Sequence, residues 1–80
     1  MSGTLRLRVL SKTGVLLDTN TESVILNAAD GSMGIRVGHL PALVLLGGGD
    51  IIYKINGEAS TFKSNGKFAE VSKGMVTVIE

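Results

Sequence analysis

Hydrophobic and polar residues alternate with a period of two along most of this 80-residue chain. The first example is the run of Leu5, Leu7 and Val9, which Arg6 and Arg8 separate. Successive side chains of a β-strand point to opposite faces, so this alternation predicts a strand with one buried and one exposed face. Similar runs return about every eight to twelve residues, with turn residues between them, as in a sandwich or barrel.

The sequence therefore predicts an all-β fold for the whole chain. Asn56-Gly57 is the clearest turn signal and predicts a two-residue type I′ hairpin. No linker, repeat or low-complexity segment divides the chain, so residues 1–80 are expected to form one domain. The expected strands lie at residues 5–9, 15–18, 23–28, 34–37, 40–46, 50–55, 58–63, 67–72 and 75–80.

One segment departs from the alternation, because residues 40–46 are apolar at every position. As a strand, it would direct Ala42 and Val44 to one face and Leu43 and Leu45 to the other, so a two-layer fold could bury only one set. Two explanations stay open. A loop or a local bend covers the second set, or the second set forms a docking surface, as contiguous exposed apolar patches usually do.

The amino-acid composition excludes several classes of functional site and partner. The chain has no cysteine and one histidine, which excludes a disulfide, a zinc finger and a cysteine nucleophile. The net charge is +1, both signs are spread along the chain, and only three aromatic rings are present, so a nucleic-acid partner is not expected. We find no transmembrane segment and no signal sequence, and expect a cytoplasmic protein without direct membrane insertion.

Candidate catalytic and ligand-binding patterns are weak. A lone histidine two residues before a proline is weak evidence for a catalytic triad, and Asp18, Asn20 and Glu22 lack the glycine and helices of a calcium loop. The glycines at 47–49 precede a strand instead of opening a helix, so we interpret them as a bend where two sheets part. We expect a protein that is not an enzyme and has no catalytic, metal or nucleotide site and no cofactor.

Several blocks occur together in an order that is similar to one known family, the ε subunit of F-type ATP synthases (δ in mitochondria). They cover nearly the whole chain, and the glycine-histidine-x-proline block is the most specific. The blocks are Asp30-Gly31-x-x-Gly34-Ile35, Gly38-His39-x-Pro41-x-Leu43, Asn65-Gly66-x-Phe68-Ala69-Glu70-Val71 and Val76-Thr77-Val78-Ile79.

The resemblance implies a two-layer antiparallel β-sandwich of about ten short strands. It also implies a non-catalytic rotor subunit on the cytoplasmic face of the membrane, which links the γ subunit to the c-ring and couples ion translocation to ATP synthesis. Carried over by position, His39, Leu43, Val44 and Leu45 would contact γ, whereas Asp30, Gly31, Ser32 and Met33 would form the loop that reaches the c-ring.

Three departures from the family pattern bear on this implication. Ser32 stands where the family usually has an acidic residue, and Val37 stands where proline is common. The sequence stops at Glu80, without the C-terminal helical hairpin of the family, so we expect a sandwich-only form without an inhibitory arm, either natural or truncated.

An alternative hypothesis belongs to another functional class. The chain could be a free-standing β-sandwich that binds a peptide or small ligand at a sheet edge and has no affinity for γ. The isolated domain is expected as a monomer or a weak self-associating species.

Overall fold

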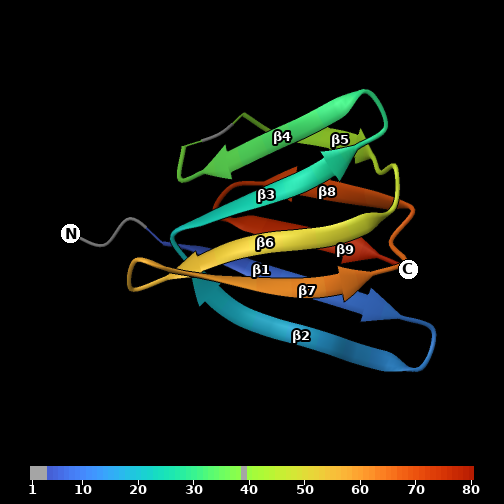
Figure 1. The fold of residues 1–80 in the computed structure, drawn as a ribbon, viewed down its shortest axis with the longest axis horizontal. Coiled ribbons are helices and arrows are strands. Elements are labelled where there is room, and N and C mark those ends of the chain that lie inside the picture. The colour runs from blue at the N-terminus through green and yellow to red at the C-terminus, as the bar shows by residue number, and fades with distance from the viewer. Residues whose placement is uncertain (1–3, 39) are drawn as a thin grey trace.

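The computed structural model describes residues 4–38 and 40–80, and it contains nine strands in this part of the chain (Figure 1). Each of the expected runs forms one strand, so the all-β prediction is confirmed. No helix of the described residues is long and apolar enough to cross a membrane. The strands are β1 Leu5–Ser11, β2 Gly14–Thr21, β3 Ser23–Ala28, β4 Gly31–Arg36, β5 Ala42–Leu45, β6 Gly49–Ile55, β7 Glu58–Ser64, β8 Phe68–Ser72 and β9 Met75–Ile79.

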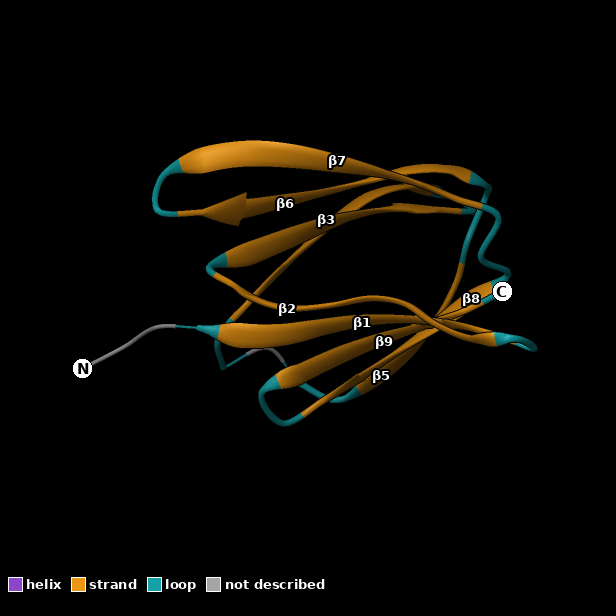
Figure 2. Ribbon diagram, turned by 90° about the horizontal axis from the view of Figure 1, so that it is seen from below, coloured by secondary structure: helices purple, strands orange, loops and turns teal. Residues whose placement is uncertain are grey.

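The strands form two sheets that pack as two layers (Figure 2). Sheet A has five strands in the order β2-β1-β9-β8-β5, and sheet B has four in the order β4-β3-β6-β7. Most neighbours are antiparallel, as expected, but β1 and β9 are parallel. The local pattern could not reveal this pairing, because it joins the two ends of the chain, and parallel neighbours are never linked by a short hairpin.

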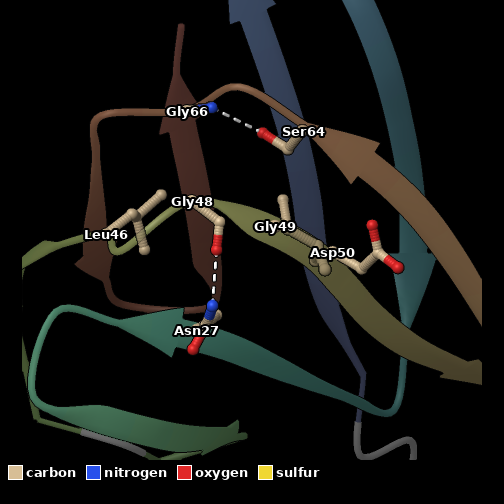
Figure 3. A pocket seen from close by; sticks show the side chains of 8 residues that line it. Asn27, Leu46, Gly48, Gly49, Asp50, Ser64 and Gly66 are labelled. Atoms are coloured by element: carbon tan, nitrogen blue, oxygen red, sulfur yellow. Dashed lines mark hydrogen bonds between the residues drawn. The ribbon is translucent and has the colours of Figure 1, made fainter.

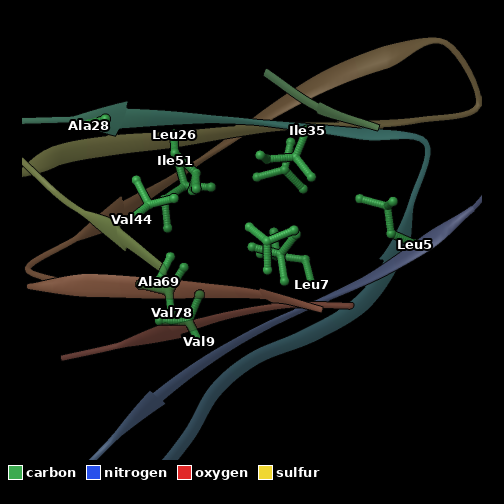
Figure 4. Close-up of a cluster of buried hydrophobic side chains, with 13 residues drawn as sticks. Leu5, Leu7, Val9, Leu26, Ala28, Ile35, Val44, Ile51, Ala69 and Val78 are labelled. Carbon is green, nitrogen blue, oxygen red and sulfur yellow. The ribbon is translucent and has the colours of Figure 1, made fainter. Parts of the chain in front are cut away.

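The core lies between the two sheets, where the inward-facing side chains of both layers meet (Figure 4). It is almost entirely aliphatic, which matches the alternating apolar positions of the sequence. The buried hydrophobic residues are Leu5, Leu7, Val9, Val24, Leu26, Ala28, Ile35, Val44, Ile51, Ala69, Val71, Val76 and Val78.

Two hairpins of sheet B have two-residue turns. Asn56 and Gly57 have φ angles of 51° and 81°, which is the left-handed pair that a type I′ turn needs, so this prediction is confirmed. Between β3 and β4, Ala28 pairs with Gly31, which leaves only Ala29 and Asp30 in the turn. The strand β4 therefore begins three residues earlier than expected from the sequence, at Gly31 instead of Gly34.

The glycines at 47–49 lie where the chain passes from β5 in sheet A to β6 in sheet B, as expected (Figure 3). The Asn27 side chain donates a hydrogen bond to the Gly48 carbonyl, and the Gly47 N–H donates one to the Asn27 carbonyl at 2.8 Å. The cavity beside these residues measures about 10 Å³. Since this is about the minimum for one water molecule, the cavity is too small for an organic ligand.

Candidate functional site

The candidate site is built on β5, an edge strand of sheet A. Val44 is 5% exposed and pairs with the buried Ala69 of β8, whereas Leu43 is 70% and Leu45 68% exposed. In the described structure, neither a bend nor a loop covers these two leucines. The side chain of Val44 belongs to the core, so it is not part of an exposed surface, in contrast to the sequence-based expectation for this residue.

Leu45 begins a row of apolar residues that crosses the outer face of sheet A. The strand register places it beside Phe68 of β8, then Ile79 of β9, Leu10 of β1 and Val15 of β2. We call these five residues the apolar row. Phe68 is 38% and Val15 54% exposed, so the row continues as solvent-accessible surface from one edge of the sheet to the other.

A polar row runs parallel to the apolar row. Its members are Leu43, Glu70, Thr77, Arg8 and Asp18, one from each strand of the sheet. Leu43 is its apolar end. Glu70 lies on one side of Thr77, and Arg8 and Asp18 lie on the other. The outer face of sheet A thus combines an apolar stripe with separate positive and negative positions.

Arg6 and Asp18 form the closest ion pair on this face. The Arg6 Nε donates to Asp18 Oδ1 at 2.6 Å, and the Arg6 Nη2 donates to Asp18 Oδ2 at 2.9 Å. The hydrogen bonds between the two side chains are the main reason that the pKa of Asp18 is lowered. The same hydrogen bonds are the main reason that the pKa of Arg6 is raised. Arg8 Nε lies 3.7 Å from Asp18 Oδ2 and has no hydrogen-bond acceptor among the described residues.

A groove of about 400 Å³ opens between β5, at the edge of sheet A, and the hairpin of β3 and β4, at the edge of sheet B. It brings together residues that the sequence assigned to two different contacts. Its lining includes Asp30 and Met33 from one set and Leu43, Val44 and Leu45 from the other. The Ala29 N–H also donates to the Leu45 carbonyl at 2.9 Å, so the hairpin is fixed directly to the end of β5.

The segment of residues 30–33 does not form a loop, which corrects the expectation. Asp30 is in the two-residue turn, and Gly31, Ser32 and Met33 begin β4. Asp30 and Ser32 are exposed, and Met33 is half-buried against the core. His39, the remaining predicted contact residue, lies outside the described residues.

Sequence reasoning missed most of the apolar row. In the sequence-based prediction, Phe68, Leu10, Val15 and Ile79 are not assigned to any exposed surface. A local signal existed for three of them, since Leu10, Phe68 and Ile79 are out of phase with the buried alternation of their own strands. Val15 is in phase with the half-buried Leu17, and only the irregular register between β1 and β2 turns it outward. Among the described residues, no three His, Cys, Asp or Glu side chains form a group that could hold a metal ion. The arrangement is suited to binding another surface.

Comparison with known proteins gives consistent matches. The family model for the "ATP synthase, Delta/Epsilon chain, beta-sandwich domain" matches residues 4–80. The chain is 37% identical over 79 residues to the ATP synthase epsilon chain of Desulfitobacterium hafniense, with coverage of 99% of this chain and 60% of that one. It is 38% identical over 76 residues to the epsilon chain of a Synechococcus strain, with coverage of 95% and 56%. The chain thus spans less than two thirds of the length of these relatives.

A solved structure shares the fold. One chain in the cryo-EM structure of the Euglena gracilis mitochondrial ATP synthase, which comprises OSCP, F1 and the c-ring, superimposes with a TM-score of 0.86. The match covers 99% of this chain and 51% of that chain at 20% sequence identity. At this identity the likeness concerns the β-sandwich itself.

Proposed function

Since the chain belongs to the family of ATP synthase delta/epsilon chain β-sandwich domains, we propose that it is a non-catalytic rotor component of an F-type ATP synthase. In this role it fastens the γ subunit to the c-ring, so that the three turn together and couple ion translocation to ATP synthesis. It would act as a peripheral part of the complex on the cytoplasmic face of the membrane.

The observation that carries this proposal is the exposed apolar surface of sheet A. A joint under torque requires slow dissociation, which well-packed apolar contacts provide better than surface charges that salt screens. Leu43, Leu45 and the rest of the apolar row supply such a surface on a rigid sheet. We assign this face, together with His39, to the contact with γ.

The turn of the β3 and β4 hairpin is assigned to the c-ring. Asp30 and Ser32 are exposed there, Gly31 and Met33 follow the turn, and the hydrogen bond from Ala29 to Leu45 holds the turn against β5. The two proposed contacts are therefore adjacent, at the same end of one edge strand. Force applied at one contact reaches the other through the backbone of β5 and not through a flexible loop.

Leu43→Asp and Leu45→Asp test the contact with γ. Each substitution places an unpaired carboxylate in the proposed interface, and each is expected to weaken binding by more than about 2 kcal/mol. Isothermal titration of the γ subunit from the same organism measures the change. Both side chains are exposed in the free protein, so circular dichroism should show that the variants remain folded.

Ile25→Asp is the matched control, because Ile25 is also exposed but lies on the outer face of sheet B. It should bind γ like the parent. Equal binding by the folded Leu43 and Leu45 variants would show that the contact lies elsewhere. If the parent chain itself fails to bind γ, the rotor proposal is wrong, and the binding of a peptide or small ligand at a sheet edge becomes the function to test.

A further inference from the structure

The charges on sheet A are arranged symmetrically about its middle strand, β9. Thr77 of β9 pairs with Arg8 of β1 on one side and with Glu70 of β8 on the other. Arg8 and Glu70 therefore lie at the same height along β9, on the two strands that flank it. The strands of sheet A carry only two further charged residues, Arg6 and Asp18, which neutralise each other.

The apolar row has the same symmetry. Ile79 of β9 is at its centre, with Leu10 and Phe68 on the adjacent strands and Val15 and Leu45 on the two edge strands. A rotation of 180° about an axis along β9 therefore exchanges apolar with apolar residues in this row. In the polar row the same rotation exchanges a cation with an anion.

We propose that a second copy of this chain docks on the outer face of sheet A, as a dimer with its two-fold axis parallel to β9. In this arrangement Arg8 of each copy faces Glu70 of the other, so that the pair forms twice. Phe68 of each copy faces Leu10 of the other, and the two Ile79 side chains meet on the axis. The inference does not depend on the rotor function, although it concerns the same face.

The state of Arg8 in the free chain favours this occupant. Both Asp18 oxygens already accept hydrogen bonds from Arg6, and Arg8 Nε is buried without an acceptor. The Arg8 side chain as a whole is 34% exposed, so a carboxylate from a second copy would pair with the accessible part of its guanidinium. Close charge pairs across an interface couple more strongly than solvent-exposed pairs do. At the rim, Asp18 would face Leu43 of the other copy, where Arg6 has already neutralised its charge.

The size of the face is also appropriate for a dimer. The molecule measures 34 × 25 × 20 Å, and the sheets lie across its two longer dimensions (Figure 1). A covered face of this size approaches the roughly 800 Å² per partner of a standard interface. Two twisted sheets cannot remain in contact at the corners of their faces, which reduces the buried area. The dimer should therefore form reversibly.

Sedimentation equilibrium of the chain, over about 1 µM to 1 mM, tests the proposal. The parent is expected to dimerise reversibly within this range. Arg8→Glu and Glu70→Arg should each raise the dimer dissociation constant by at least about tenfold, because each turns two attractive pairs into two repulsive ones. The double variant should return to within about threefold of the parent, since it restores both pairs with exchanged signs.

An equimolar mixture of the two single variants gives the sharpest result. Two-fold symmetry predicts a heterodimer as tight as the parent dimer, because both contacts again join opposite charges, and no effect within one chain reproduces this rescue. Lys63→Glu, on the outer face of sheet B, is the charge-reversal control and should leave dimerisation unchanged. A parent that stays monomeric, a dimer insensitive to the single variants, or a mixture without rescue would overturn the proposal.

Discussion

Among the residues that the structure describes, Arg6 and Asp18 are those with clearly perturbed pKa values, and the lowered pKa of Asp18 makes folding pH-dependent. The hydrogen bonds from Arg6 lower the pKa of Asp18 in the folded chain relative to the unfolded chain. The stabilisation is therefore complete above the unfolded pKa of about 3.9 and is lost as the pH falls through the lower folded value. Part of any acid destabilisation should originate here.

Asp18→Asn tests this origin. The variant should be less stable than the parent at neutral pH, and the difference should shrink as the pH falls below about 3.9, because the parent loses the same interaction by protonation. Urea unfolding at several pH values measures the change. In an Arg6→Gln background the same substitution should have a smaller effect, and an unchanged effect would show that Arg6 is not the cause.

Gly66 is required for a packing reason, because a Cβ at this position would lie 2.5 Å from Val78 Cγ1 and 3.1 Å from Leu46 Cδ1. Gly66→Ala is expected to destabilise the fold by about 1–3 kcal/mol, which is typical of overpacking. Gly34→Ala is the control, since a Cβ there contacts nothing within 4 Å, and this variant should be neutral or slightly stabilising. Urea unfolding compares the two, and equal losses would contradict the packing explanation.

At the scale of the element, β5 shows how one short strand serves both the core and the surface. The sequence is apolar on both faces, and the pairing with β8 decides which side chains are buried. Val44 meets Ala69 inside the sandwich, whereas Leu43 and Leu45 remain outside. Adjacent positions of one apolar run should therefore lose very different amounts of stability on the same substitution.

Val44→Asp and Leu45→Asp make this comparison. An isolated carboxylate in place of Val44 would cost several kcal/mol, a large share of the roughly 4–12 kcal/mol expected for a domain of this length. We expect the Val44 variant to lose more than about 12 °C in Tm or to be unfolded, and the Leu45 variant to change by less than about 6 °C. Thermal unfolding followed by circular dichroism measures both, and similar losses would show that β5 does not have two distinct faces.

At the scale of the whole molecule, one face is assigned to two partners, the γ subunit and a second copy. Both would cover the apolar row, so the two complexes should exclude each other. The dimer would then protect the apolar surface until assembly, and γ would replace the second copy when the rotor forms.

Competition between the partners can be measured by energy transfer between differently labelled copies. Saturating γ is expected to abolish the transfer, because each γ-bound chain has lost its dimer surface. Leu45→Asp should abolish transfer without γ, whereas Ile25→Asp should retain it. A complex that contains γ and two copies in contact would contradict the shared surface.

The sequence was sufficient for most features that depend on local order along the chain, although it missed the two-residue turn between β3 and β4. The period-two alternation identified the strands, and Asn56-Gly57 identified the turn between β6 and β7. The sequence of residues 40–46 also showed a segment that is apolar on both faces. These features follow from steric preferences and side-chain direction, which neighbouring residues determine. The resemblance of the sequence motifs to those of ATP synthase ε subunits then indicated the family.

Only the tertiary structure decided which residues share a surface. The parallel pairing of β1 with β9, and the register that aligns Leu45, Phe68, Ile79, Leu10 and Val15, join segments that are far apart in the chain. Alternation specifies that a side chain points outward, but not which strand lies next to it, because the neighbour is selected by packing of the entire core. The docking face therefore exists only once both sheets have formed.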